Sequence, residues 1–92
     1  MEVKAVFTGL LRHYAGTRED TFELPEGAVV ADLLREAGRR YGARFPAGVW
    51  DAQTESFGNI VITGRKGGGV IDGSEALQPG DAVMIIAKLA GG

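Results

Sequence analysis

The feature that most constrains the fold is an apolar segment near the end of the chain, residues 82–87, which reads Ala-Val-Met-Ile-Ile-Ala. Its length and β-branched content indicate a strand. A strand that is apolar at nearly every position is normally central in its sheet or covered on both faces. Just before it, Gln78-Pro79-Gly80-Asp81 favours a type II turn. The last strand is therefore expected in the middle of a sheet.

The first part of the chain predicts two further strands. Apolar residues alternate from Val3 to Phe7, which gives a first strand from Glu2 to Leu11. A polar turn is expected at residues 15–20. The alternating stretch Thr21–Leu24 then gives a second strand, which Pro25 ends. These two strands are expected to form a hairpin.

One amphipathic helix is predicted over residues 30–41. Its apolar face consists of Val30, Leu33, Leu34, Ala37 and Tyr41. Asp32 in the first turn and arginines in the last turn suit the helix dipole, and Gly42 is placed as the C′ residue. The internal Gly38 should cost about 1 kcal/mol relative to alanine. A close approach of the helix to the sheet would explain it.

The rest of the chain is less regular. Residues 43–57 show no period and predict a long connection, with a short helical turn near Gly48–Trp50. Within it, Trp50 is either an anchor for a partner or a cover for the core. A strand is expected at 59–63, a turn at 64–69 and a short return strand at 70–71.

The expected order is β-β-α-β-(β)-β, which places the fold in the α+β class. Set side by side in the sheet's centre, the first and last strands would be parallel, with the one main helix packed across one face of a mixed sheet. This is the ubiquitin-like β-grasp. We expect a β-grasp domain over residues 1–88 and a flexible C-terminal tail over 89–92, which ends in Gly91-Gly92.

Composition narrows the function classes. The chain has no cysteine, so thiolate metal sites, disulfides and thiol catalysis are excluded, and its single histidine, His13, cannot build a histidine metal cluster. A net charge of −2 lacks the excess of basic residues that is typical of nucleic-acid-binding proteins. No apolar run approaches the roughly 20 residues of a membrane span, and the first residues lack a signal-peptide pattern. A cytoplasmic location, with no membrane partner and no metal, is the expectation.

Several stretches along nearly the whole chain resemble the small sulfur carriers of the ThiS/MoaD superfamily. This β-grasp family includes the small subunit of molybdopterin synthase and the carrier of the thiamine pathway. The matching stretches are the opening strand 3–7, Leu10–Gly16, Val30–Leu34, Leu77–Val83 and the terminal Gly91-Gly92. Each stretch is weak alone. Their order and the terminal position of the glycines make the resemblance specific, and it is closest to the molybdopterin synthase subunit.

The resemblance implies a non-catalytic carrier that works through its terminal carboxylate. Gly92 would be adenylated and converted to a thiocarboxylate, with Leu89, Ala90 and Gly91 as the slender tail. The implied partners are an adenylating enzyme of the ubiquitin-activating type, a sulfur donor protein, and the large subunit of molybdopterin synthase or another sulfur acceptor. The carrier would bind no cofactor and have no catalytic residues of its own, because the partner enzyme uses the ATP.

Two questions stay open from the sequence. The first is the fate of Gly92: because adenylation is shared with ubiquitin-like modifiers, Gly92 could instead be joined to lysines of other proteins. Sulfur delivery for thiamine synthesis or tRNA thiolation, and a plain interaction module, are further alternatives for the function. The second question concerns a partner interface at Met84, Ile86 and Lys88. If Val83 and Ile85 face the helix, Met84 and Ile86 lie on the opposite face, which is either an interface or covered by residues 43–57.

Overall fold

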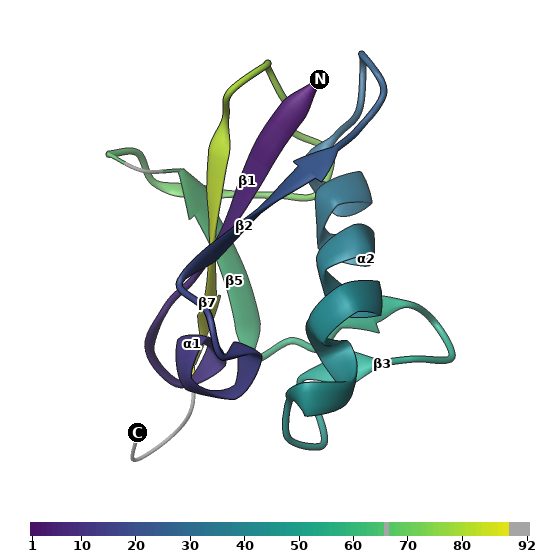
Figure 1. Ribbon diagram of the computed structural model, residues 1–92, viewed down its shortest axis with the longest axis vertical. Helices are drawn as coiled ribbons and strands as arrows, with labels where there is room; N and C mark the ends of the chain where they lie inside the picture. The colour runs from purple at the N-terminus through teal and green to yellow at the C-terminus, as the bar shows by residue number, and fades with distance from the viewer. Residues whose placement is uncertain (66, 89–92) are drawn as a thin grey trace.

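The computed structural model describes residues 1–65 and 67–88. Figure 1 shows a sheet with one long helix, α2, packed beside it and a short helix, α1, at one end of the sheet. In chain order the elements are β1 (Glu2–Phe7), α1 (Gly9–Ala15), β2 (Glu19–Glu23), α2 (Val30–Tyr41), a 3-10 turn (Gly42–Arg44), β3 (Trp50–Asp51), β4 (Ser56–Phe57), β5 (Val61–Arg65), β6 (Val70–Ile71) and β7 (Ala82–Ala87).

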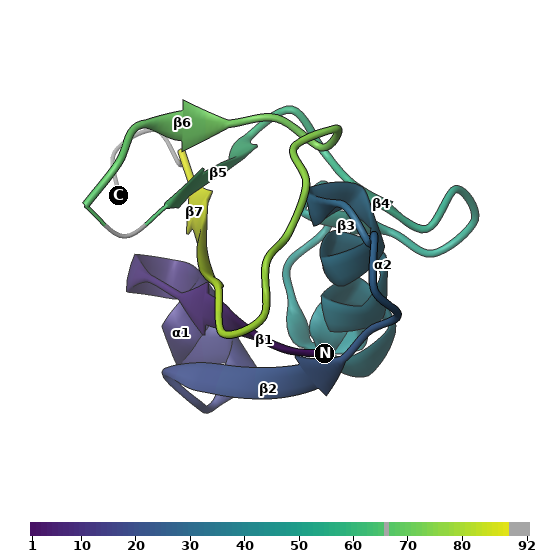
Figure 2. The same cartoon turned by 90° about the horizontal axis from the view of Figure 1, so that it is seen from above.

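The main sheet has the strand order β2-β1-β7-β5-β6. The expected parallel pair at its centre is confirmed, because β1 and β7 run side by side with Ala5 opposite Val83 and Phe7 opposite Ile85. The neighbours β2 and β5 are antiparallel to this pair. Figure 2 shows α2 alongside one face of this curved sheet. The predicted turn before β7 is present, with Gly80 at a φ of +83°.

The predicted strand from Glu2 to Leu11 is wrong beyond Phe7. Residues Gly9–Ala15 form α1 instead, which begins at Gly9 with a φ of +53° and ends at Gly16, a left-handed cap with a φ of +77°. Leu11 and Ala15, four positions apart, are both buried. The two N-terminal strands are antiparallel as expected, but a helix joins them rather than a tight turn.

The helix predicted over residues 30–41 is confirmed as α2. Val30, Leu33 and Ala37 are fully buried against the sheet, while Leu34 is only half-buried at the edge of the core. The aromatic ring of Phe7 in β1 meets that of Tyr41 edge-on at 5.0 Å between centroids. These contacts join α2 to the two central strands, so the core lies directly behind β1 and β7.

Two glycines, Gly38 in α2 and Gly42 just after it, pack against the Trp50 ring rather than against the sheet. A Cβ on Gly38 would lie 2.0–2.2 Å from ring carbons of Trp50, and one on Gly42 would lie 2.2–2.6 Å from other ring atoms. Gly42 is therefore not the predicted left-handed cap. It has a helical φ of −55° and continues into the 3-10 turn Gly42–Arg44. The open question about Trp50 is answered in favour of packing: its ring covers the helix and touches Phe57.

Residues 43–57 contain more structure than their sequence suggested. β3 and β4 pair as a small second sheet, with Trp50 opposite Phe57. The expected helical turn lies earlier, at Gly42–Arg44. The strand predicted at 59–63 is shifted to Val61–Arg65 as β5, because Asn59 and Ile60 form a turn closed by a hydrogen bond from the Val61 N–H to the Gly58 carbonyl, 3.0 Å long.

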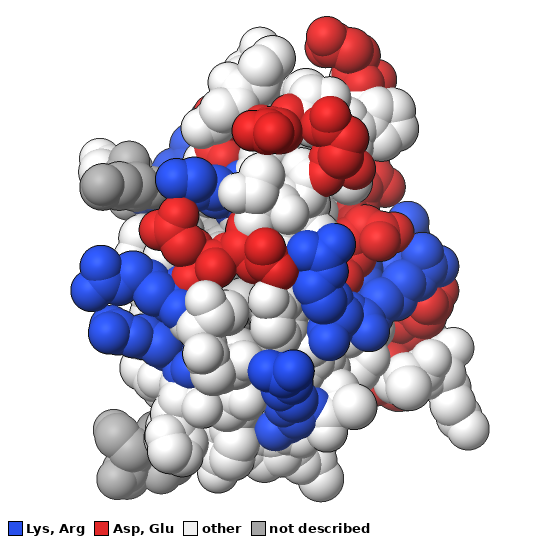
Figure 3. Space-filling model, in the orientation of Figure 1, with Lys and Arg blue, Asp and Glu red and all other residues white. Residues whose placement is uncertain are grey.

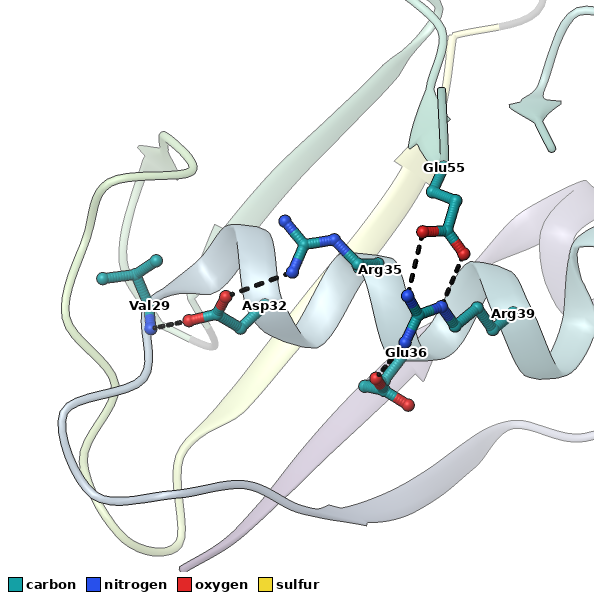
Figure 4. Close-up of polar contacts among 6 residues, drawn as sticks. All are labelled: Val29, Asp32, Arg35, Glu36, Arg39 and Glu55. Carbon is teal, nitrogen blue, oxygen red and sulfur yellow. Dashed lines mark hydrogen bonds and ion pairs between the residues drawn. The ribbon is translucent and has the colours of Figure 1, made fainter. Parts of the chain in front are cut away.

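An ion-pair cluster fastens the β3–β4 hairpin to α2 (Figure 4). The guanidinium of Arg39 donates two hydrogen bonds to the carboxylate of Glu55, at 2.6 and 2.9 Å, and a third to Glu36 at 2.9 Å. Glu55 holds a φ of +52° at the end of the hairpin. At the start of the same helix, Asp32 accepts the N–H of Val29, as the dipole argument expected for an acid in the first turn.

Candidate functional site

The base of the predicted tail is firmly held. β7 lies between β1 and β5, and beyond its last residue the N–H of Lys88 donates a 2.6 Å hydrogen bond to the carbonyl of Ile60. Lys88 itself is exposed. The predicted tail residues Leu89, Ala90, Gly91 and Gly92, including the attachment site, lie outside the described residues. The structure therefore describes the chain up to the point where the tail begins.

Side chains of β7 alternate between the two faces of the sheet. Val83 and Ile85 are fully buried on the face that α2 covers. Met84 and Ile86 are partly exposed and lie on the other face, which we call the outer face. The premise of the interface prediction is therefore confirmed, although the interface itself stays a prediction.

The outer face continues across neighbouring strands. The register sets Val6 of β1 and Gly64 of β5 on either side of Met84, and Ile62 beside Ile86. Val70 of β6 stands opposite Gly64 and is 73% exposed. Because Gly64 has no side chain, Met84 has no cross-strand cover from β5. The result is an apolar strip across the centre of the sheet.

The long connection does not cover this strip. Residues of the β3–β4 hairpin pack on α2, through Trp50 on Gly38 and Gly42 and through Arg39 to Glu55. Figure 2 places β3 and β4 beside α2. The alternative that residues 43–57 cover the outer face is therefore wrong.

A polar cluster ties β2 to the end of α2. The carboxylate of Asp20 accepts a 2.5 Å hydrogen bond from the hydroxyl of Tyr41 and a 2.9 Å bond from the guanidinium of Arg40. These donors, with Tyr41 the stronger, hold the pKa of Asp20 below its usual value. Arg40 also stacks over the ring of Phe22. Every group in the cluster has a structural partner, which indicates a role in fold stability.

Two kinds of site lack support among residues 1–65 and 67–88. In that part of the chain no group of three or more His, Cys, Asp and Glu side chains could hold a metal ion. The helices there are also too short and too polar to cross a membrane. The candidate site is thus the tail, its anchored base and the surfaces around that base.

Comparisons with known proteins agree with this arrangement. The chain is 26% identical over 92 residues to small archaeal modifier protein 3 of Haloferax volcanii, and the alignment covers all of both chains. Molybdopterin converting factor subunit 1 of Pyrococcus furiosus superposes with a TM-score of 0.72 at 27% identity, covering 97% of this chain and 99% of that one. The resemblance to the ThiS/MoaD-like β-grasp proteins is confirmed.

A third comparison supports the fold alone. SAMP1 of Haloferax volcanii superposes with a TM-score of 0.81 over the whole of both chains, at 18% identity. The predicted ubiquitin-like β-grasp is therefore confirmed as the fold class. No protein-family model matches the chain. The relatives include both a modifier protein and a molybdopterin converting factor subunit, so they do not separate the two functions considered from the sequence.

Sequence reasoning missed the surface that α1 forms. Leu10 and Tyr14 of this helix are 42% and 40% exposed. The sequence assigned Leu10 to a strand, and Tyr14 lies between that strand and the predicted turn. A signal was present: Leu11 and Ala15 are four positions apart and Gly16 follows as a cap residue, which is a short helix pattern.

Proposed function

We propose that this chain is a carrier whose Gly92 carboxylate is adenylated by a partner enzyme and converted to a thiocarboxylate, which donates sulfur for a molybdopterin-type cofactor. The observation that carries the proposal is the coincidence of a β-grasp domain with a Gly-Gly sequence that follows its central strand after three residues. The likeness to molybdopterin converting factor subunit 1 over nearly the full length of both chains supports the choice of pathway.

The chemistry explains why such a tail needs a partner. A carboxylate is a poor acyl donor because its leaving group is an oxide. Attack of the Gly92 carboxylate on the α-phosphate of ATP forms an acyl-adenylate and releases pyrophosphate. A persulfide of the donor protein then displaces AMP and forms an acyl disulfide. A second thiol breaks its S–S bond, which leaves the thiocarboxylate on Gly92 and a disulfide on the donor side.

The domain's part in this chemistry is presentation. The hydrogen bond from Lys88 to Ile60 fixes the direction in which the chain leaves the sheet. The apolar strip around Met84 and Ile86 gives the partner a surface to bind while the tail reaches its active site. The domain supplies rigidity and the partner supplies the catalytic groups, including those that bind ATP.

A second candidate function is conjugation of Gly92 to lysines of other proteins. It is favoured by the end-to-end similarity to a small archaeal modifier protein. The acyl-adenylate is common to both functions, and they differ only in whether sulfur or an amine displaces AMP. We infer the carrier function first because the molybdopterin subunit matches at similar identity and with a close superposition.

The test of activation is ATP–pyrophosphate exchange with the adenylating enzyme of the same organism. Wild type should support exchange. One residue added after Gly92 moves the carboxylate by about 3.3–3.6 Å and should abolish most of it. Gly91→Val, which thickens the tail, should also lose most exchange, whereas Gly92→Ala should be intermediate. Ala52→Val in the exposed β3–β4 loop adds the same two methyl groups as a Gly91→Val change adds beyond alanine, and it should have no effect.

Intact mass spectrometry of the protein from its own cells separates the two fates. A carrier should show the mass increase of one oxygen replaced by sulfur, and a modifier should show higher-mass conjugates. Undiminished exchange with the extended chain would remove the terminal carboxylate from the mechanism. Both functions would then be refuted together.

A further inference from the structure

The surface of α1 carries an unusual pair of apolar side chains. Of the three large hydrophobic side chains that are exposed among the described residues, two, Leu10 and Tyr14, belong to this seven-residue helix. They are four positions apart, so they lie on the same side of the helix. The buried Leu11 and Ala15 already anchor α1 to the domain. Leu10 and Tyr14 are therefore available to a second molecule.

Basic side chains flank this apolar pair. Arg12, His13 and Arg18 line a shallow hollow between α1 and the start of β2. Among the described residues, no Asp or Glu lies within ion-pair distance of Arg12, Arg18 or Lys88. All but one of the other described Lys and Arg side chains have such a partner: Lys4, Arg35, Arg39, Arg40 and Arg65. The remaining one, Arg44, donates a 2.6 Å hydrogen bond to the carbonyl of Ala15 at the end of α1.

These groups all lie at the end of the sheet from which the tail departs. Since β1 and β7 are parallel, α1 follows β1 at the same end where Lys88 follows β7. The N–H and the hydroxyl of Thr8 both donate to the carbonyl of Ile85, which fixes the start of α1 against β7. Figure 1 shows α1 at the bottom of the sheet, and few acidic side chains are visible in the lower part of Figure 3.

We propose that the surface formed by Leu10, Arg12, His13, Tyr14 and Arg18, here called the α1 surface, docks an acidic and partly apolar segment of the adenylating enzyme that takes up the tail. The inference rests on the proposed function, because it assumes that a partner receives Gly92. It adds a second contact, separate from the apolar strip around Met84. Cations left without an internal partner at this end are complementary to carboxylates placed beside the partner's tail slot.

A protein segment fits the α1 surface better than a nucleic acid or a free phosphate. Exposed apolar anchors with charged residues at their edge are typical of protein interfaces. A polyanion would also meet the repulsion of a chain whose formal net charge is −2. The charges should act mainly by steering the encounter and fixing its orientation, whereas Leu10 and Tyr14 should slow dissociation.

The test is ATP–pyrophosphate exchange with the cognate adenylating enzyme, measured against carrier concentration at low and high salt. Arg12→Gln/Arg18→Gln should raise the half-saturating concentration by about four- to twenty-five-fold, since each exposed pair contributes a factor of about two to five. The maximal rate should be unchanged, and the salt dependence should weaken. Leu10→Ser/Tyr14→Ser should also raise the half-saturating concentration but keep the salt dependence.

The matched control is Arg35→Glu, on α2, which changes the net charge by the same two units and should leave the half-saturating concentration at the wild-type value. The two α1-surface double variants should melt close to wild type, because their side chains are exposed and the two arginines form no ion pair with the described residues. Arg35→Glu breaks an exposed ion pair with Asp32, which contributes little to stability, so its melting temperature should also stay close to wild type. If both double variants match Arg35→Glu, the inference is overturned while the proposed function stands. Absence of exchange with wild type would refute the proposed function and this inference with it.

A second experiment tests whether the α1 surface binds phosphate groups instead of a protein segment. The amide signals of the α1 surface are followed by NMR as pyrophosphate or AMP is added to the free domain. We expect no saturable shifts in the low millimolar range. Saturable shifts that are lost in Arg12→Gln/Arg18→Gln, together with unchanged exchange kinetics of that variant, would identify a phosphate site and overturn the docking proposal.

Discussion

Gly38→Ala should destabilise the domain, although alanine is the better helix former. The added Cβ would lie 2.0–2.2 Å from three carbons of the Trp50 ring, which is far inside van der Waals contact. A small shift of the ring cannot relieve the clash, because Phe57 meets it edge-to-face at 4.9 Å between centroids and other atoms of the ring pack against Gly42. Expelling this half-buried ring should cost about 3 kcal/mol, the lower end for a large aromatic residue. The helix propensity of alanine returns about 1 kcal/mol.

The net expectation is a loss of about 2 kcal/mol in the free energy of unfolding. For a domain of this size that lowers the melting temperature by roughly 8–16 °C. Urea unfolding followed by circular dichroism measures the change. Fluorescence reports the displaced ring directly, because the chain has one tryptophan. Gly69→Ala is the matched control, since a Cβ there meets nothing within 4 Å.

A double-mutant cycle isolates the cause. In a Trp50→Ala background the space beside Gly38 is empty, so Gly38→Ala should raise the free energy of unfolding by about 1 kcal/mol. The coupling energy between the two positions should then be about 3 kcal/mol. A stabilising Gly38→Ala in the wild-type background would refute the reasoning. So would the same destabilisation with and without the ring, because the clash would then not be with Trp50.

Three further predictions concern the core, the outer face and pH. Leu33→Ala, at a fully buried position, should cost about 2–5 kcal/mol in urea unfolding, whereas deletion of Gly91-Gly92 should change stability by less than about 0.5 kcal/mol; equal losses would contradict this. Met84→Lys should leave the melting temperature of the free domain near wild type and weaken binding to the adenylating enzyme, and unfolding of the free protein would show that the outer face is internally covered. Because the pKa of Asp20 is lowered in the folded state, its carboxylate contributes stability above about pH 4, and this is lost as the pH falls through the folded-state pKa. Asp20→Asn should therefore make the loss of stability at acid pH less steep. An unchanged acid dependence would count against the Tyr41 and Arg40 contacts.

The central part of the fold was predictable because its signals are long and regular. The apolar run at 82–87 predicts a strand in the centre of the sheet, and the period of residues 30–41 predicts a helix that covers one face of it. Together they fix the parallel pair β1 and β7. α1 was not predictable in the same way, since it has only seven residues and is held by tertiary burial of Leu11 and Ala15.

Gly38 and Gly42 show which contacts a single sequence cannot predict. Gly38 and Gly42 are four positions apart, which by itself predicts a notch along one side of the helix. The sequence does not say what fills the notch, because residues 43–57 have no period that orients Trp50. The orientation of Met84 and Ile86 was predictable from strand alternation, but whether their face is open depended on where that same segment packs.

The anchored base of the tail limits how any partner can approach. Lys88 is hydrogen-bonded to Ile60, so at most four residues lie between a fixed point and the end of Gly92. Fully extended, they reach about 13–14 Å. If Gly92 is the attachment site, as proposed, a partner that buries its carboxylate must come within that distance of the end of β7. Near there it meets the apolar strip around Ile86 on the sheet and α1 beside it. With so short a tail, a partner that binds the carboxylate also contacts this end of the domain.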